Sequence, residues 1–384
     1  MFDLQSAISD TGVRLCLDCG KCTVVCPVTR YDAEFNPRRI VQEVLRLNGR
    51  SPVSTTILSC INCNMCIERC NYNVRFTDFI RFLRYKALEE GAEINYSHGG
   101  APQTIMHIMA HRETRQDRLD WLPQDIKIAK QSDTAFFVGC APYFDVLFSD
   151  LSVNTIEGIK GALRLLNYAQ IPFRLVPNER CCGRDLLLLG DIDGFLALAR
   201  ANIHEFNKRG IKNIITSCPE GYYTLKIDYP KFLKDWAINV LHITEVIASL
   251  IENGQLAFGR FKQKVTYQDP CTLGRYARIF DQPRSILAAV NGLSLVEMSD
   301  NRAKSLCCGS SPWAYCGTIN KQIQKERLAQ AGATGADILV TACPKCQIHL
   351  KCAQKNAESN DVCQIKIQDI YDLAAQSLLP QEVS

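Results

Sequence analysis

Two runs of four cysteines near the N-terminus constrain this 384-residue chain more than any other feature of its sequence. In each run, two residues separate the first three cysteines from one another, and the fourth follows after three more residues. The runs are Cys16, Cys19, Cys22 and Cys26, followed by Cys60, Cys63, Cys66 and Cys70. Three thiolates at such short spacing can wrap one face of a compact metal–sulfur core. The sequence therefore predicts two such centres in the first 92 residues.

The register of both runs is that of a bacterial two-cluster ferredoxin, in which each run holds a [4Fe–4S] cubane. The fourth cysteine of a run then ligates the other cluster, because the chain turns away after the three-residue gap. We therefore predict one cubane on Cys16, Cys19, Cys22 and Cys70, and a second on Cys60, Cys63, Cys66 and Cys26. Cysteines two residues apart also bind zinc, so a pair of zinc sites is the alternative. Two complete runs in one register favour the cubanes.

Helices are predicted around the cysteine loops. Asn36 fits the N-cap position, Pro37 the first helical turn and Gly49 the stop signal of a helix between the runs. An apolar stripe over residues 76–83 predicts a second helix after Cys70. Residues 1–92 are thus expected to form an α-helical ferredoxin-like domain, and residues 93–133 a linker.

The rest of the chain repeats one cysteine pattern twice. The matched positions are Cys140 with Cys271, Cys181 and Cys182 with Cys307 and Cys308, and Cys218 with Cys343. Their offsets of 131, 126 and 125 residues indicate a duplicated domain. Each matched position follows a run rich in β-branched residues, at 134–139, 171–176 and 213–217 in the first copy and at 264–270, 293–298 and 337–342 in the second. We predict two Rossmann-like α/β domains, 134–258 and 259–384, with the cysteines at the carboxyl ends of parallel strands. The whole chain is then an α+β multidomain protein.

The double cysteine in each copy is informative. Adjacent side chains diverge, so two neighbouring cysteines serve one cubane poorly. The second copy adds Cys346 two residues after Cys343, which gives a set of five: Cys271, Cys307, Cys308, Cys343 and Cys346. Five thiols that include an adjacent pair suggest an irregular iron–sulfur unit with bridging thiolates.

Together these motifs resemble the D-type polypeptide of heterodisulfide reductase, which is a fusion of the C and B subunits of that enzyme. The chain is similar also to iron–sulfur subunits of glycolate and lactate oxidases and of a sulfite-reduction-associated membrane complex. All contain the cysteine-rich CCG domain, and the resemblance extends from Cys16 to about Lys351. It implies that the five-cysteine set of the second copy binds a noncubane [4Fe–4S] cluster, and that heterodisulfide reductase itself uses two such clusters facing one disulfide. Our hypothesis is that the site in the second copy is the reaction centre of this chain.

The first copy departs from the family pattern. It keeps Cys140, Cys181, Cys182 and Cys218, but Gly221 stands where the fifth cysteine is expected. This copy could hold a different cluster, hold another metal, or be a vestigial structural half. Its loss of a ligand puts a mechanism with two noncubane clusters in doubt.

The resemblance implies a heterodisulfide reductase-type oxidoreductase of anaerobic metabolism, in which electrons pass through the cubanes to or from a thiol or disulfide at the noncubane cluster. The alternative is a relay without catalysis, partnered by a glycolate- or lactate-type flavin dehydrogenase or by a quinone-reactive membrane cytochrome b. The sequence contains no glycine-rich dinucleotide fingerprint after a strand and no P-loop, so we expect it to bind no flavin or nucleotide itself. Partner proteins must then supply the electron donor and acceptor.

The composition indicates the cellular compartment in which this chemistry takes place. Twenty cysteines in a chain long enough to bury its own core indicate metal or redox chemistry in a reducing compartment. We find no secretory signal pattern and no stretch of 18 apolar residues, so we expect a cytoplasmic protein, attached to a membrane only through a partner. The net charge of +4 is too small to indicate nucleic-acid binding.

Several residues near the cysteine sets have open roles. Cys316 is a spare ligand or substrate-facing thiol on one interpretation and a buried apolar thiol on the other, and Cys352 and Cys363 are expected to be structural. Four arginines flank the cluster cysteines and either tune the clusters or face solvent: Arg180, Arg184, Arg275 and Arg278.

Overall fold

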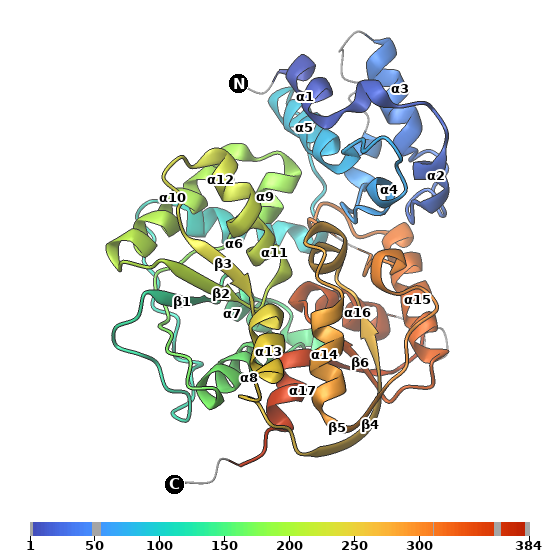
Figure 1. The fold of residues 1–384 in the computed structure, drawn as a ribbon. Helices are drawn as coiled ribbons and strands as arrows, with labels where there is room; N and C mark the ends of the chain where they lie inside the picture. Colours follow the sequence, from blue (N-terminus) through green and yellow to red (C-terminus); the bar gives the residue numbers. More distant parts are fainter. Residues whose placement is uncertain (1–2, 48–54, 310, 357–361, 381–384) are drawn as a thin grey trace.

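The computed structural model describes residues 3–47, 55–309, 311–356 and 362–380, which form a helical N-terminal domain and two α/β repeats (Figure 1). The helices of the N-terminal domain are α1 (Leu4–Thr11), α2 (Lys21–Val25), α3 (Pro37–Arg46), α4 (Met65–Glu68) and α5 (Phe76–Glu89). It lies at the top of Figure 1, above the second repeat. No helix of the described residues is both long enough and apolar enough to cross a bilayer.

Both predicted helices of this domain are confirmed. Helix α3 begins at Pro37, and the Asn36 side chain accepts a hydrogen bond of 3.1 Å from the backbone N–H of Arg39. This is the N-cap interaction that its sequence predicts. Helix α5 buries the apolar stripe that starts at Phe76. Gly49, the predicted stop signal of the first helix, lies outside the described residues.

Each repeat contains a parallel sheet, which confirms the predicted α/β architecture. The first sheet has the order β1 (Thr134–Phe137), β2 (Asn213–Thr216), β3 (Asn239–His242). The second has the order β5 (Asn291–Leu295), β4 (Arg260–Gln268), β6 (Ile338–Thr341), β7 (Lys366–Asp369). Arg174 forms a parallel bridge with Ala135 on the open side of β1, where β5 flanks β4 in the second repeat. The two repeats therefore share one strand order, as expected after a duplication.

The predicted strand at 171–176 is wrong in extent, because only a single bridge at Arg174 forms there. Pro172 lacks the N–H that a ladder needs, so regular pairing cannot extend through it. The short strands β3 and β7 were not predicted from the sequence. Both have four residues and begin with an exposed one, so they carry too little periodicity to be recognised.

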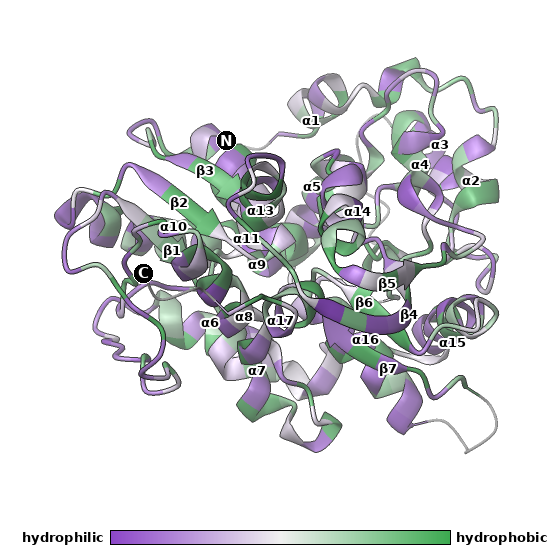
Figure 2. Cartoon of the chain, turned by 60° about the horizontal axis from the view of Figure 1, so that its bottom comes forward, coloured by the Kyte–Doolittle hydropathy of each residue, from purple (hydrophilic) through white to green (hydrophobic). Residues whose placement is uncertain are grey.

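Helices cover both sheets. In the first repeat they are α7 (Ala141–Leu147), α8 (Thr155–Tyr168), α9 (Arg184–Leu189), α10 (Ile192–Lys208), α11 (Pro219–Tyr223), α12 (Tyr229–Phe232) and α13 (Ile243–Glu252). In the second they are α14 (Asp281–Ala289), α15 (Thr318–Gly332), α16 (Pro344–Lys355) and α17 (Ile370–Gln376). The segment predicted as a linker contains α6 (Ala101–Ala110), which packs against α9 and α10. Figure 2 shows the hydrophobic residues of β6 enclosed by these helices.

The repeats meet through reciprocal helix contacts. Helix α17 of the second repeat packs on α8 of the first, and α13 of the first packs on α14 of the second (Figure 1). Gly158 and Gly161 allow the close approach of α8, because a Cβ atom at Gly161 would lie 2.5 Å from the backbone carbonyl of Tyr371. This arrangement joins the two repeats into one pseudo-symmetric body.

Replacing Gly161 by valine should destabilise the protein by about 1–3 kcal/mol, because the new side chain overlaps the backbone of α17. The free energy of unfolding in urea measures the effect. Gly221→Ala is the matched control, since the nearest atoms to its added Cβ lie at an ordinary 3.5 Å. Equal stability of the two variants would contradict the close contact between α8 and α17.

Candidate functional site

The eight cysteines of the N-terminal domain line two neighbouring cavities. Four of them line the first cavity, namely Cys16, Cys19, Cys22 and Cys70. Four line the second, namely Cys26, Cys60, Cys63 and Cys66. Cys66 also borders the first cavity, so the two cavities share a wall. The fourth cysteine of each run thus lies with the first three of the other run, which is the grouping that the ferredoxin register predicts.

Burial differs between these two thiol sets. Cys60, Cys63 and Cys66 are buried, whereas Cys19 is exposed. Burial raises the pKa of Cys60 to about 12 and that of Cys63 to about 11. Such thiols keep their protons at neutral pH unless a bound cation displaces them. In the described part of the chain, no three His, Cys, Asp or Glu side chains are placed to hold a single metal ion. The residues present fit a larger unit that several cavity-lining thiolates hold from its outside.

The structure brings the five cysteines of the second repeat together. Hydrogen bonds between thiols connect them in the order Cys271, Cys307, Cys308, Cys346, Cys343. The thiols of Cys307 and Cys346 hydrogen-bond to Cys308 and lower its pKa. The His349 Nδ1 atom lies 3.4 Å from the Cys308 Sγ atom. A continuous set of five soft donors, four of them buried and Cys271 half-buried, fits an iron–sulfur unit with bridging thiolates.

The first repeat brings its four cysteines together in a similar way. Cys181 hydrogen-bonds to both Cys140 and Cys182, and Cys218 lies close enough to Cys182 for the two charges to interact. A Cβ atom at Gly221 would lie 3.6 Å from the Cβ atom of Cys218. The backbone therefore has room for a side chain at this position, and the fifth thiol is missing only because the residue is glycine.

The second N-terminal cavity adjoins the thiols of the second repeat. Cys63 is close enough to Cys271 and Cys307 for their negative charges to raise one another's pKa. Arg275 lies between them: its Nε atom donates to the Cys63 carbonyl at 2.6 Å, and its Nη1 atom to the Ser305 carbonyl at 2.6 Å. Its buried Nη2 atom has no hydrogen-bond partner among the described residues. A cation with a spare donor thus separates two thiol sets.

A buried ion-pair cluster joins the two repeats beside their thiols. The Lys345 ammonium group forms ion pairs with the carboxylates of Asp185 and Glu220, and all three side chains are buried. Lys345 stands between Cys343 and Cys346, and Glu220 follows Cys218 by two residues. This cluster was not predicted from the sequence. The sequence feature that could have predicted this cluster is the repeat alignment, in which Glu220 and Lys345 are matched positions with opposite charges.

The four flanking arginines have different environments. Arg180, Arg184 and Arg275 are buried, and Arg184 forms an ion pair of 3.2 Å with Asp228. The Arg278 side chain is 61% exposed and pairs with Glu68, so the solvated alternative holds for this arginine alone. Of the spare cysteines, Cys316 accepts a hydrogen bond of 3.9 Å from Gln324, and Cys352 accepts one of 3.0 Å from Lys321.

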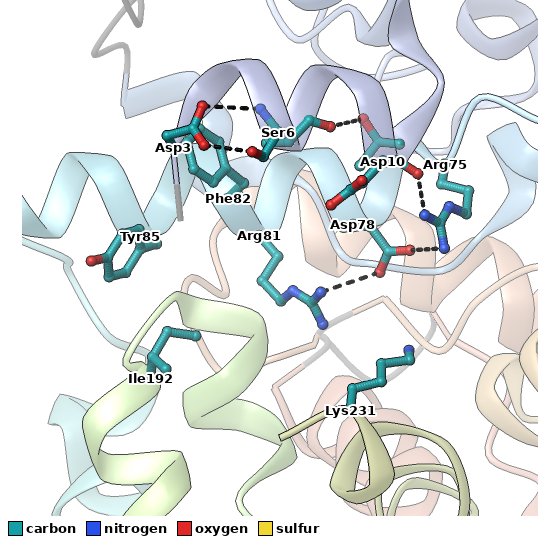
Figure 3. A pocket seen from close by; sticks show the side chains of 12 residues that line it. Asp3, Ser6, Asp10, Arg75, Asp78, Arg81, Phe82, Tyr85, Ile192 and Lys231 are labelled. Atoms are coloured by element: carbon teal, nitrogen blue, oxygen red, sulfur yellow. Dashed lines mark hydrogen bonds and ion pairs between the residues drawn. The ribbon is translucent and has the colours of Figure 1, made fainter. Parts of the chain in front are cut away.

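A separate cavity of about 420 Å³ lies between α1, α5 and the first repeat (Figure 3). No cysteine lines it. Its charged side chains largely neutralise one another, since Asp78 pairs with Arg75 at 3.7 Å and with Arg81 at 3.8 Å. Lys231, on its opposite wall, pairs with Asp228. Nothing in its chemistry connects it to the thiol sites.

Comparison with protein families agrees with this division. A 4Fe-4S dicluster domain matches residues 12–74. A cysteine-rich domain of the CCG type matches residues 134–226 and again 265–351. The matches include all the cysteines of the two N-terminal cavities and of the two repeat sites.

Curated relatives match nearly the whole chain. The D-type polypeptide of the dihydromethanophenazine:CoB–CoM heterodisulfide reductase of Methanosarcina barkeri is 27% identical, over 94% of this chain and 93% of the relative. A probable iron–sulfur-binding oxidoreductase of Bacillus subtilis, FadF, is 27% identical over 98% of this chain. The EtfAB:quinone oxidoreductase of Syntrophomonas wolfei is 25% identical over 93%. The chain spans 61% and 57% of the length of the last two.

Proposed function

This chain belongs with the iron–sulfur proteins of the CCG domain family that are related to the D-type polypeptide of heterodisulfide reductase, and from that membership we propose that it passes electrons between a redox partner and a thiol or disulfide substrate. The observation that carries the proposal is the adjacency of its thiol sets. The second N-terminal cavity adjoins the five thiols of the second repeat, with Arg275 between them. Redox groups held there would lie in one continuous path.

The proposed ligands follow the thiol sets. One [4Fe–4S] cubane would be held by Cys16, Cys19, Cys22 and Cys70, a second by Cys26, Cys60, Cys63 and Cys66, and a noncubane [4Fe–4S] cluster by Cys271, Cys307, Cys308, Cys343 and Cys346. When bound, these clusters supply single electrons, two of which, with two protons, convert a disulfide into two thiols.

The chain's own residues prepare this site in three ways. The thiols lose their protons when the metal is bound. Arg275 holds a fixed positive charge and one unused donor between two thiol sets, which favours negative charge there. His349 contacts Cys308 and thereby restricts the orientation of that side chain. The substrate class is proposed from the family resemblance.

We assign the reaction to the second repeat, because the first lacks a fifth thiol at Gly221. Cys140, Cys181, Cys182 and Cys218 then hold a different cluster, hold another metal, or stabilise the fold as free thiols. The number of irons bound per chain distinguishes a first repeat that holds an iron–sulfur cluster from one that holds none.

A relay without catalysis is the second candidate function. It is favoured by the incomplete first repeat and by relatives described as an EtfAB:quinone oxidoreductase and as an iron–sulfur-binding oxidoreductase. In that case the partner is a flavoprotein or a quinone-reactive membrane cytochrome b, and disulfide chemistry is absent. Both candidates place the protein in the cytoplasm or on the cytoplasmic face of a membrane through a partner protein.

Electron paramagnetic resonance of the oxidised protein separates the two functions. Adding candidate thiols one at a time should produce a new signal if a substrate sulfur reacts at the second repeat. The Cys308→Ser variant is the control and should lose that response while its cubane signals persist. No change with any thiol, in protein that contains its full iron, would favour the relay.

A further inference from the structure

Exposed apolar side chains gather around the first N-terminal cavity. Leu15 is 58% exposed, Leu17 63%, Val24 82% and Tyr72 45%. These are four of the eleven large hydrophobic side chains exposed in the described residues, and Leu17 and Tyr72 line the cavity itself. Cys19, at the same place, is the one cysteine classed as exposed among the twenty, all of which are described. The first thiol set is therefore the one that a partner can approach most closely.

Positive charge surrounds the same cavity. The segments 12–25, 36–39 and 69–75, which supply most of its lining, contain six basic residues and one acidic residue, Asp18. Arg38 pairs with Asp18 at 3.4 Å, and Arg75 pairs with Asp78 at 3.7 Å. The exposed side chains of Lys21, which lines the cavity, and of Arg69, which precedes Cys70, form no ion pair within the described part of the chain. Two cations are thus left to face a partner.

This combination resembles the anatomy of a protein interface. Apolar side chains at the centre of an interface supply contact area, and charges at its rim steer the approach of a partner of opposite sign. A small ion or molecule would need no exposed valine and leucine side chains around the thiols. A lipid surface would use both features, but it has no need of a thiol site at the centre.

Resting on the proposed function, we propose that this surface, named the docking face, binds an acidic electron-transfer protein whose redox centre then lies against the Cys16, Cys19, Cys22 and Cys70 site. The docking face comprises Leu15, Leu17, Lys21, Val24, Arg69 and Tyr72. Electrons enter or leave the chain there. The second repeat, at the opposite end of the path, handles the substrate.

Stopped-flow reduction of the cluster-loaded protein by an acidic reduced two-cluster ferredoxin tests the docking face. The double charge reversal Lys21→Glu/Arg69→Glu should slow reduction about tenfold at low ionic strength, because steering is lost. Added salt should slow the reduction of the wild type until its rate approaches that of the variant, and it should change the rate of the variant little. Lys130→Glu/Lys212→Glu, which changes one exposed lysine of the segment before the first repeat and one of the first repeat, is the matched control and should keep the wild-type rate. Val24→Asn should slow reduction at every salt concentration.

Iron content and the extent of reduction by excess titanium citrate are measured on each variant. Suppose that iron content and extent of reduction are normal, and that the rate of reduction by ferredoxin depends neither on salt nor on charge reversal. The docking face is then refuted and the proposed function stands. If the wild type holds no clusters, the proposed function fails and the inference fails with it. Binding to phosphatidylglycerol vesicles that Lys21→Glu/Arg69→Glu abolishes, with an unchanged ferredoxin rate, would assign the face to a membrane and refute the proposal.

Discussion

Replacing Lys345 by methionine is expected to lower the free energy of unfolding by about 3–5 kcal/mol. Lys345 is buried and is the ion-pair partner of two buried carboxylates, those of Asp185 and Glu220. Methionine fills similar space but leaves both buried carboxylates without their ion-pair partner. Because these residues come from both repeats, the loss should appear as one cooperative decrease in urea stability of the cluster-loaded protein.

The triple variant Lys345→Met/Asp185→Asn/Glu220→Gln separates charge from packing. It removes all three charges while it nearly preserves the shapes, so most of the lost stability should return. A triple variant as unstable as Lys345→Met would show that the lysine acts through its packing, for example over the Trp313 ring 5.4 Å away. The ion-pair cluster of Lys345, Asp185 and Glu220 would then have no electrostatic role between the repeats.

Replacing Arg275 by glutamine is expected to lower the reduction potential of the neighbouring redox centres by on the order of 100 mV. Reduction adds negative charge, which the nearby guanidinium group stabilises. At an effective dielectric constant of about 20, a charge a few ångströms away contributes on the order of 2–4 kcal/mol. A redox titration followed by electron paramagnetic resonance measures the shift.

Arg278→Gln is the matched control for this potential. Arg278 lies three residues from Arg275, but its side chain is 61% exposed and pairs with Glu68. Solvent screens its charge, so the potential should change by only a small part of the Arg275→Gln shift. Equal shifts in the two variants would show that overall charge, not the buried position of Arg275, sets the potential.

Local patterns predicted most of the candidate site. The spacing of the two N-terminal runs is a property of consecutive residues, and the cysteines that it groups line the same cavities in the structure. The repeat offsets brought the cysteines of each α/β copy together because duplicated domains share a strand order. The strands β3 and β7 were missed because four residues leave almost no periodic signal, and the extent of the 171–176 run was overestimated at Pro172.

What the sequence did not predict depends on packing between distant segments. The position of Arg275 against Cys63 joins residues more than two hundred positions apart. The contact of Lys345 with Asp185 and Glu220 requires the two repeats to face each other. No local pattern contains such information. The repeat alignment placed Glu220 opposite Lys345, however, and in a pseudo-symmetric pair such matched positions of opposite charge are candidates for contact.

Iron and acid-labile sulfide analysis of anaerobically prepared protein tests the central claim most directly. Two cubanes and one noncubane cluster require about 12 irons and about 12 sulfides per chain, and Cys308→Ser should retain about 8 of each with unchanged cubane signals. About 16 irons in the wild type would show that the first repeat holds a cluster as well. About 8 irons in the wild type, or no loss in Cys308→Ser, would contradict a cluster on the five cysteines of the second repeat.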